Sequence, residues 1–566
     1  MESALQQPPS PDDVDAAAPH SIATPDGQLK RKRQPRNSAC QACAALKMKC
    51  IATPTGRCER CHRMERECIP AVPKARKRRT ASNVGESEGI PWGEFAGPSA
   101  SHSGPPPKFD LPVGNHPEYQ ADRSNLLSRH DLSHNDSKSF IALFARGLGN
   151  SAACEELLRG VDYNFVHKAL TIYAQLTPYF PFVELRPGAD IIRMVASRPV
   201  LTLAICTVSS GAHLELQDRL TQAFRYALSS KVLLGGERSM DVLTGLLVFL
   251  AWYHQYRSQH HFYQQLSLLA GIAADLGLYN RSYLPPEDPS SNVERDRAFV
   301  GCYYLCANLS AIGFDRPNPM RWTNHLRACA ESAAAAGGMP SDRALVAVLE
   351  LACAIDEMED GLRQATDGRD PISPQVIDGY TRAASQRLKA LKREFPSLGG
   401  TLGFAASSIH IYQRQLRAGP SPESSMLIQC ACSVKEYVDE LLARPPATLH
   451  QMSSVDWAHM LETLVLMSRV FRPPPSAGGW EAGALTSMLQ RDVALESVIA
   501  HMENAPQADP LAPRHASLLL TFRNLCEAIK RGSAAGGGPA GRRAQLSYFG
   551  SGVLEPAFWD NLAGVS

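Results

Sequence analysis

From about residue 120 to residue 530, hydrophobic residues recur at steps of three and four, the period of an amphipathic α-helix. In residues 291–309 one such stripe consists of Phe299, Cys302, Tyr303, Cys306 and Leu309. Ser291 and Glu294 have the spacing of a capping box, which predicts that a helix begins there. We interpret Cys302 and Cys306 as small hydrophobic residues that pack in the core, without a chemical role.

Two further segments support a helical fold. In residues 264–278, "QQLSLLAGIAADLGL", a stripe runs from Leu266 through Leu269 and Ala273 to Leu276, and Gly277 suits a helix end. Residues 242–253, "VLTGLLVFLAWY", are apolar on all sides, which predicts a buried central helix. That run of about a dozen residues is too short to cross a bilayer, so we expect no membrane partner. No strand-rich region stands out, so the predicted fold class is mostly α.

Composition predicts the domain organisation. Residues 1–29 are rich in proline, alanine and acids and should be a disordered acidic N-terminus. Residues 80–119 are rich in proline, glycine and serine and read as a linker. We expect a large all-α domain over residues 120–530 and a flexible tail over residues 531–566. The first residues lack the basic start and apolar stretch of a signal peptide, which predicts an intracellular chain with reduced thiols.

The net charge of +2 hides a strong local asymmetry. Residues 1–29 contain five acids and no lysine or arginine, whereas residues 30–79 contain 16 basic residues against three acids, a net of +13. A block of this kind predicts a polyanionic partner for residues 30–79.

The same block contains six of the chain's 15 cysteines, which are Cys40, Cys43, Cys50, Cys58, Cys61 and Cys68. They form the pattern C-x2-C-x6-C twice, displaced by 18 positions. A redox interpretation uses Cys40 and Cys43 and leaves four cysteines unexplained, and disulfides conflict with an intracellular location. A metal site accounts for all six. Two zinc ions have eight coordination positions, which six thiolates fill if two sulfurs bridge both metals.

Residues 36–70, "RNSACQACAALKMKCIATPTGRCERCHRMERECIP", resemble the binuclear zinc cluster, the DNA-binding domain of a large class of fungal transcription factors. The resemblance implies two Zn²⁺ ions bridged by Cys40 and Cys58, a double-stranded DNA partner and a nuclear location. Between about 180 and 335, "AGIAADLGL", "ERDRAFVGCYYLCANLS" and "RPNPMRW" resemble the middle homology region of the same family. That likeness implies that residues 120–530 are regulatory, and family members often control one metabolic or secondary-metabolite gene cluster.

Candidate DNA contacts follow from the cluster. Lys47 and Lys49 cannot face the same way on one helix, because residues two apart lie on different faces. The resemblance implies that Lys47 reads guanine in CGG-like half-sites, and lysine can donate to guanine O6 and N7. Arg60 and Arg63 are expected to contact the DNA backbone. The basic flank at 73–79 predicts further phosphate contacts, through Arg76, Lys77, Arg78 and Arg79.

Two questions about partners stay open. No heptads follow the cluster, so dimerisation with a second copy through a coiled coil is not predicted. The tail ends in "YFGSGVLEPAFWDNLAGVS", whose acids and aromatics are typical of segments that fold on the transcription machinery. The other interpretation is that the tail docks on its own helical domain and buries Phe558 and Trp559.

The alternative function is that of an enzyme, an all-α terpene synthase with a nucleic-acid-binding tether. "DEMED" at 356–360 resembles the aspartate-rich metal motif of all-α terpene synthases, but no second metal motif accompanies it. We expect a charged, exposed helix face there instead. His254, His260 and His261 have no partners at ligand spacing. The predicted function is therefore a sequence-specific regulator of RNA polymerase II transcription without enzymatic activity.

Overall fold

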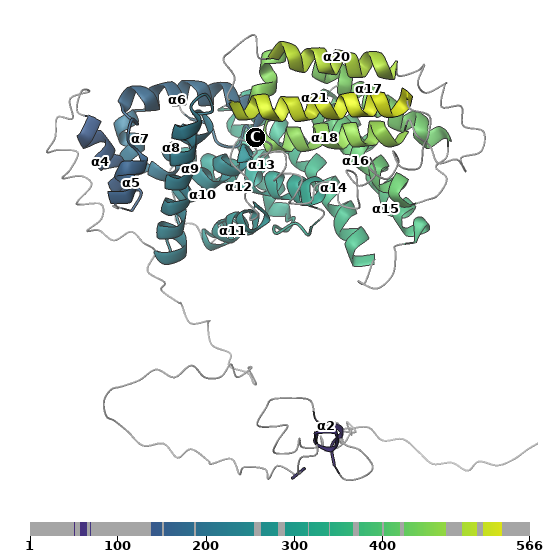
Figure 1. The fold of residues 1–566 in the computed structure, drawn as a ribbon, viewed down its shortest axis with the longest axis horizontal. Helices are drawn as coiled ribbons and strands as arrows, with labels where there is room; N and C mark the ends of the chain where they lie inside the picture. Colours follow the sequence, from purple (N-terminus) through teal and green to yellow (C-terminus); the bar gives the residue numbers. More distant parts are fainter. Residues whose placement is uncertain are drawn as a thin grey trace, which may run out of the picture. The chain divides into compact units, whose positions relative to one another are not determined.

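The computed structural model divides the chain into two units, Met1–Pro107 and Lys108–Ser566. The residues that it describes are 50, 57–64, 68–69, 137–149, 152–185, 188–253, 262–280, 289–314, 316–338, 340–365, 373–398, 401–418, 424–470, 490–505 and 513–534. All elements in these ranges are helical, and none of the described residues forms a strand, which confirms the mostly α prediction (Figure 1).

The described element of the first unit is α2, Glu59–Arg63. The α-helices of the second unit are α4 Ser137–Gly147, α5 Ala152–Leu157, α6 Tyr163–Leu176, α7 Ile191–Ser197, α8 Pro199–Val208, α9 Leu214–Leu228, α10 Met240–Ala251, α11 Phe262–Asp275, α12 Pro289–Asn308, α13 Asn324–Ala336, α14 Leu345–Ala365, α15 Pro374–Glu394, α16 Leu402–Ala418, α17 Ser424–Leu442, α18 Ser454–Val470, α20 Arg491–Asn504 and α21 Pro513–Ala534. Shorter turns of 3₁₀ or π-helix are η1 Thr177–Tyr179, η2 Ser229–Leu234, η5 Leu309–Phe314, η6 Pro340–Ala344, η7 Pro396–Leu398 and η8 Pro446–Gln451.

Helices α8 and α10 form the buried centre of the N-terminal half of the second unit. Every residue of α8 is buried, and so is every residue of α10 from Asp241 to its end, which confirms the predicted central helix. Gly245 lets the two helices approach closely, because a Cβ there would lie 2.8 Å from Val200 Cγ1. The Asp241 carboxylate accepts hydrogen bonds from the first amides of α8, Val200 N at 3.1 Å and Leu201 N at 2.9 Å. Those amides have no partner within their own helix, so α10 caps α8.

Helix α11 ends as its glycine predicts. Gly277 has a φ of 71°, a left-handed conformation that glycine adopts at little cost. Leu278 N donates to Ala273 O at 3.2 Å, and Gly277 N donates to Ala274 O at 2.9 Å. This pair of bonds satisfies two of the last carbonyls of the helix.

Helix α12 confirms the predicted stripe but not its predicted beginning. The stripe residues Phe299, Cys302, Tyr303, Cys306 and Leu309 are all buried. The helix begins at Pro289, so the capping box at Ser291 and Glu294 is wrong. Proline suits the first turn because it lacks an amide hydrogen that would go unsatisfied there. Glu294 instead forms an ion pair with Arg198 at 2.5 Å.

An aromatic cluster joins the two halves of the second unit. The indole of Trp252 donates from Nε1 to Gln451 O at 3.2 Å, across 199 residues of sequence. Its ring packs edge-on against Tyr173 and Phe180, with centroids 6.1 and 6.0 Å away. The Tyr173 hydroxyl donates to Val183 O at 2.7 Å. Trp252, which directly follows α10, therefore links Tyr173 and Phe180 to η8.

Helices α20 and α21 form an antiparallel pair that packs on α17 and α18 (Figure 1). Two ion pairs set the register, Lys530 with Glu496 at 2.6 Å and Arg523 with Glu503 at 3.3 Å. Helix α21 continues to Ala534, four residues beyond the predicted end of the helical domain.

Taken one at a time, the described helices are too short or too polar to cross a bilayer; α7 and α8 reach that length and apolarity only as a pair bent by 115°. The predictions for residues 1–29, 80–119 and 535–566, and for His254, His260 and His261, lie outside the described residues.

Candidate metal centre

The second cysteine triplet forms a compact turn in the first unit. Cys58 and Cys61 flank the first residues of α2, and His62 N donates to Cys58 O at 2.9 Å, which closes one helical turn. That turn brings both thiols to the same side. Cys61 N donates to Cys58 Sγ at 3.4 Å, and both cysteines are 3% exposed.

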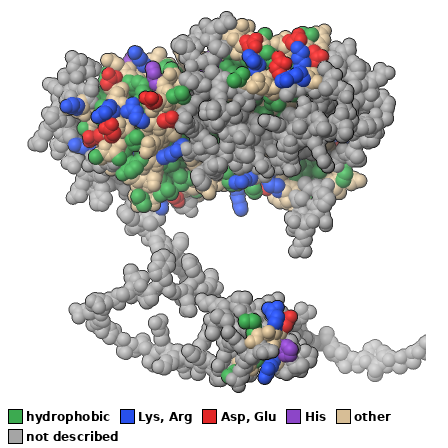
Figure 2. All heavy atoms as spheres, viewed as in Figure 1, with side chains coloured by type: hydrophobic (Ala, Val, Ile, Leu, Met, Phe, Trp, Pro, Cys, Tyr) green, Lys and Arg blue, Asp and Glu red, His purple; other side chains and the backbone are tan. Residues whose placement is uncertain are grey.

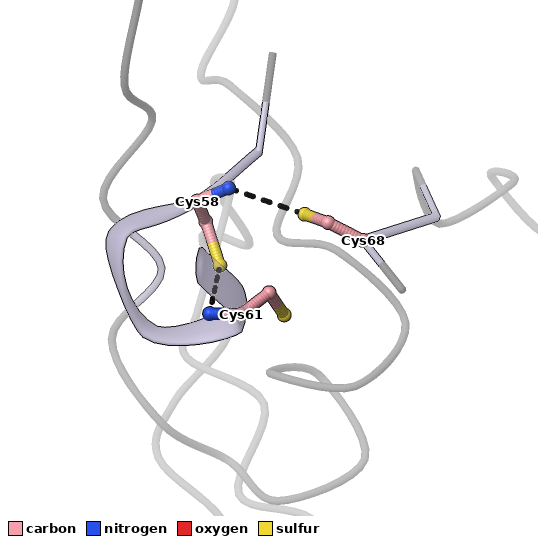
Figure 3. A group of neighbouring side chains, drawn as sticks. All are labelled: Cys58, Cys61 and Cys68. Atoms are coloured by element: carbon pink, nitrogen blue, oxygen red, sulfur yellow. Dashed lines mark hydrogen bonds between the residues drawn. The ribbon is translucent and has the colours of Figure 1, made fainter. Parts of the chain in front are cut away.

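Cys68 returns to this turn from outside the helix. Its Sγ accepts a hydrogen bond from Cys58 N at 3.2 Å (Figure 3). The three Sγ atoms of Cys58, Cys61 and Cys68 all lie within 4.8 Å of one another. Amide-to-sulfur bonds of this kind stabilise the thiolate form that a metal requires.

These sulfurs fit a zinc ion. Zinc binds thiolate sulfur at about 2.3 Å in a tetrahedron, which places two ligand sulfurs roughly 3.8 Å apart. The three sulfurs lie within 4.8 Å of one another, so at most a small inward movement of the side chains would complete three ligands. Cys50 is half-buried and packs against the same small cluster. Cys40 and Cys43 lie outside the described residues.

The alternative roles of the cysteines can be compared with the structure. The 13 described cysteines form no disulfide with one another. Cys302 and Cys306 lie at the centre of the second unit and are fully buried, which confirms their packing role. Burial raises the pKa of Cys302 and of Cys306 far above that of an ordinary thiol, so both stay protonated.

The predicted DNA contacts are only partly described. Glu59, His62 and Arg63 are exposed on α2, and Arg57 is exposed just before it. Figure 2 shows basic, acidic and histidine side chains gathered there. Arg60 lies within α2. Lys47, Lys49, Arg76, Lys77, Arg78 and Arg79 lie outside the described residues. On the visible face of the second unit, acidic and basic side chains are interspersed (Figure 2).

The acidic motif at 356–360 is only partly the exposed face that we expected, because Glu357 and Asp360 are exposed but Asp356 and Glu359 are not. Asp356 is largely buried and accepts hydrogen bonds from the Tyr303 hydroxyl at 2.8 Å and from Asn318 Nδ2 at 2.9 Å. Burial raises the pKa of Asp356 above its ordinary value. Glu359 is 1% exposed, whereas Glu357 is exposed and pairs with Arg387. Because protein partners occupy Asp356, Glu357 and Glu359, the motif shows no sign of the magnesium site of the enzyme interpretation.

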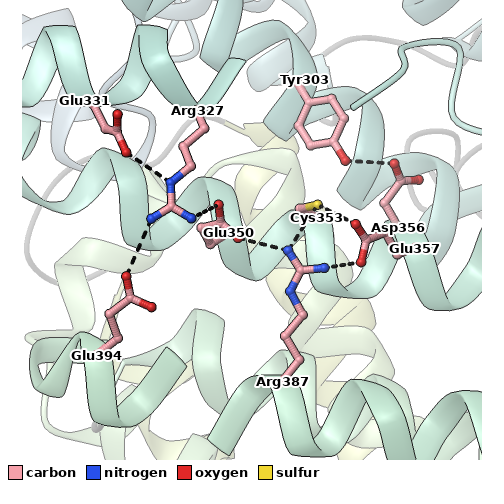
Figure 4. A network of polar contacts seen from close by, with 9 residues as sticks. All are labelled: Tyr303, Arg327, Glu331, Glu350, Cys353, Asp356, Glu357, Arg387 and Glu394. Carbon is pink, nitrogen blue, oxygen red and sulfur yellow. Dashed lines mark hydrogen bonds and ion pairs between the residues drawn. The ribbon is translucent and has the colours of Figure 1, made fainter. Parts of the chain in front are cut away.

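Arg387 and Arg327 connect three neighbouring helices through one shared carboxylate (Figure 4). Arg387 on α15 donates to Glu350 on α14 at 2.9 Å and to Cys353 Sγ at 3.4 Å. Arg327 on α13 donates to the other oxygen of Glu350 at 3.2 Å. Arg327 also forms ion pairs with Glu331 at 3.0 Å and with Glu394 at 3.6 Å. The network ties α13, α14 and α15 together.

A buried charge cluster, which the sequence did not predict, lies between α14, α16 and α18. His410 contacts Glu462 Oε1 through Nδ1 at 2.7 Å and Glu359 Oε1 through Nε2 at 2.8 Å. Arg414 adds two hydrogen bonds to Glu359, both of 2.6 Å. We call Glu359, His410, Arg414 and Glu462 the charge cluster. One signal was available in the sequence, because His410 and Arg414 are four apart and share a helix face.

The charge cluster shifts two pKa values in opposite directions. Burial alone would lower the pKa of His410, but the two carboxylates outweigh it and raise the value to about 9. Burial alone would raise the pKa of Glu359, but Arg414 and His410 lower it to about 2. Near neutral pH the imidazole is therefore a cation that joins two helices through two carboxylates.

Comparison with known proteins places the chain among fungal relatives. It is 21% identical over 485 residues to transcription factor opdL of Penicillium oxalicum, an alignment that covers 78% of this chain and 79% of opdL. It is 26% identical over 335 residues to transcription factor himD of Aspergillus japonicus, covering 55% of this chain and 50% of himD. A protein of Aspergillus terreus named transcription factor is 22% identical over 323 residues, 52% of this chain and 48% of that protein. These similarities support the resemblance to fungal transcription factors at this coarser level. No family model matches the chain, and no solved structure matches it.

Proposed function

We propose that the chain is a sequence-specific DNA-binding regulator of RNA polymerase II transcription, of the fungal zinc cluster type. Residues 30–79 would hold two Zn²⁺ ions through the six cysteines of the repeat, with Cys40 and Cys58 as the bridging ligands that the resemblance implies. The observation that carries the proposal is the convergence of Cys58, Cys61 and Cys68, which gives one of the two cysteine triplets a metal-ligand geometry. The names of the three fungal relatives support the same class.

Each part of the chain has a role in this proposal. Lys47 would read guanine in CGG-like half-sites, and Lys49, Arg60, Arg63 and residues 76–79 would contact the DNA nearby. The basic segments on either side of the cysteines, residues 30–36 and 73–79, would also direct nuclear import. The helical unit would be regulatory, responding to a ligand or contacting another subunit. The targets would be genes of one metabolic or secondary-metabolite cluster, as the resemblance implies.

Zinc stoichiometry tests the metal centre. We expect two zinc ions per full-length chain by elemental analysis, and loss of structure in residues 30–79 on chelation, because metal binding supplies the folding free energy of such small domains. Cys61→Ser should lose zinc, whereas Cys432→Ser, which removes an exposed thiol on α17, should keep both ions. A value of one zinc ion per chain would refute the bridged cluster.

Selection of random DNA duplexes by the zinc-loaded chain tests sequence reading. We expect enrichment of CGG-like half-sites, and the selected spacing reports whether one or two copies bind. Recovery of unenriched duplexes by a chain that holds two zinc ions would refute sequence-specific recognition and leave the metal centre intact.

The tail is the proposed contact with the transcription machinery. Fusion of residues 544–566 to an unrelated DNA-binding domain should raise reporter output, and Phe558→Ala with Trp559→Ala should abolish the increase. A silent fusion, together with a lower Tm of the chain when the tail is deleted, would support docking on the helical unit instead.

A further inference from the structure

The sulfur ligands of the candidate metal centre differ in their access to solvent. Cys58 and Cys61 are each 3% exposed, whereas Cys68, which lies beyond α2, is only half-buried. A solute that reacts with sulfur therefore reaches Cys68 first among the three. Susceptibility of a cysteine to oxidation follows its thiolate character and its exposure, and metal ligation supplies the thiolate.

The Cys68 sulfur lies near a second sulfur, that of Cys58. The amide of Cys58 donates to Cys68 Sγ at 3.2 Å, and the two Sγ atoms are within 4.8 Å of each other (Figure 3). A disulfide needs an S–S distance of about 2.05 Å, so the two side chains would have to close a gap of at most about 3 Å. The hydrogen bond holds Cys68 at the backbone of Cys58 rather than at that of Cys61.

We propose that Cys68 is an oxidation site for small hydroperoxides, and that its oxidation closes a disulfide with Cys58 and expels zinc. This inference rests on the proposed function. With hydrogen peroxide as the oxidant, the Cys68 thiolate attacks one oxygen, so an S–O bond forms, the O–O bond breaks and hydroxide leaves. The Cys58 thiolate then attacks the sulfenic sulfur, forming the S–S bond and releasing a second hydroxide. Two thiolates lose two electrons, the peroxide gains them, and two protons convert both hydroxides to water.

Loss of these two sulfurs dismantles the centre. Six thiolates fill the eight coordination positions of two zinc ions only if two of the sulfurs bridge both ions. After the disulfide forms, four thiolates remain, and one of the two bridging ligands of the proposed cluster, Cys58, is lost. Without metal, residues 30–79 lack a folding core, so specific DNA binding should fall to the non-specific level. That level is weaker by at least about 10³-fold. A thiol reductant with added zinc should reverse the change.

The experiment treats the zinc-loaded full-length chain with hydrogen peroxide and follows three quantities over time. They are zinc release, affinity for the selected duplex, and the cysteine pairing read by mass spectrometry after alkylation. We expect a Cys58–Cys68 disulfide to appear in step with zinc release and loss of DNA binding. A Cys58–Cys61 or Cys61–Cys68 disulfide as the first product would overturn the assignment, and so would an unchanged centre under peroxide that oxidises the exposed Cys432.

Substitutions distinguish oxidation at Cys68 from oxidation of other side chains. Cys68→His replaces the oxidisable thiol with another zinc-ligating side chain, so peroxide should release the zinc that this variant retains more slowly than it releases zinc from the unmodified chain. Cys432→Ser should behave like the unmodified chain. Met64 is a second oxidisable side chain near the centre and is 52% exposed. Thiol reductants do not repair methionine sulfoxide, so a response that they reverse does not come from Met64. Met64→Leu should therefore leave the response to peroxide unchanged. If untreated protein lacks zinc or specific binding, the proposed function fails. If it has both and Cys68→His is as sensitive as the unmodified chain, this inference alone fails.

Discussion

Replacement of His410 by glutamine would remove the cation that lies between two buried carboxylates. His410 contacts Glu359 and Glu462 at 2.8 and 2.7 Å, and the side chains of all three are 4% exposed or less. Glutamine keeps hydrogen-bonding capacity but no charge. The change leaves Glu359 paired with Arg414 but takes the imidazolium away from Glu462. Removal of one partner from a buried ion pair costs about 3–5 kcal/mol.

The magnitude can be worked independently from the pKa of His410. Its value of about 9 exceeds the ordinary value of 6.5, and each pH unit of difference corresponds to about 1.4 kcal/mol. The folded chain therefore binds this proton about 3 kcal/mol more tightly than the unfolded chain does. Because the folded pKa is raised, this stabilisation is complete below pH 6.5 and is lost as the pH rises through 9.

The assay is urea unfolding of the chain at several pH values from 6 to 10, followed by circular dichroism and by tryptophan fluorescence. Coincident transitions would allow a single free energy of unfolding for the helical unit. The difference between His410→Gln and the unmodified chain should shrink by about 3 kcal/mol between pH 6 and pH 10. His167→Gln, at an exposed position of α6, serves as the control and should give a small, constant difference. A large but pH-independent effect of His410→Gln would show that the imidazole is neutral in the folded chain, and the reasoning would be refuted.

Two further predictions concern packing and DNA reading. Gly301→Ala would place a Cβ 2.4 Å from the Phe182 Cβ and should cost about 1–3 kcal/mol, whereas Gly271→Ala meets nothing within 4 Å and should stabilise α11 by about 0.5–1 kcal/mol. Equal Tm values for the two variants would contradict the close approach at α12. Lys47→Ala should reduce discrimination between cognate and scrambled duplexes by about 1–3 kcal/mol, and alanine substitutions at 76–79 should weaken both duplexes alike and flatten the salt dependence of binding. Equal weakening by Lys47→Ala on both duplexes would mean that Lys47 contacts phosphate only.

Periodicity predicted the features that depend on local sequence. The apolar run at 242–253 is a buried helix with two buried residues after it, and Gly277 ends α11 in the left-handed conformation that was expected. Helix beginnings were less secure. Ser291 and Glu294 have capping-box spacing, but the helix begins two residues before Ser291, at Pro289. Glu294 forms an ion pair with Arg198, which is distant in the sequence.

Contacts between distant segments could not be read in the same way. The acids at 356–360 look like a solvated face because their partners come from other helices, and Glu359 meets His410 across 51 residues. A periodic pattern says which positions face inward, not which polar groups meet there. At the candidate metal centre the repeated spacing predicted the convergence of Cys58, Cys61 and Cys68, whereas the different exposure of Cys68 could be seen only in three dimensions.

The hydrogen bond from Trp252 to Gln451 has a practical meaning for deletion mapping. A chain shortened from its C-terminus into η8 or α18 would lose the partner of a buried indole and the cover of the aromatic cluster, and should misfold. Low reporter output from such a fragment would result from degradation of the misfolded protein, not from the loss of an activating segment. End points beyond Ala534, where α21 is complete, avoid this confusion, and protein abundance measured beside reporter output would separate the two causes.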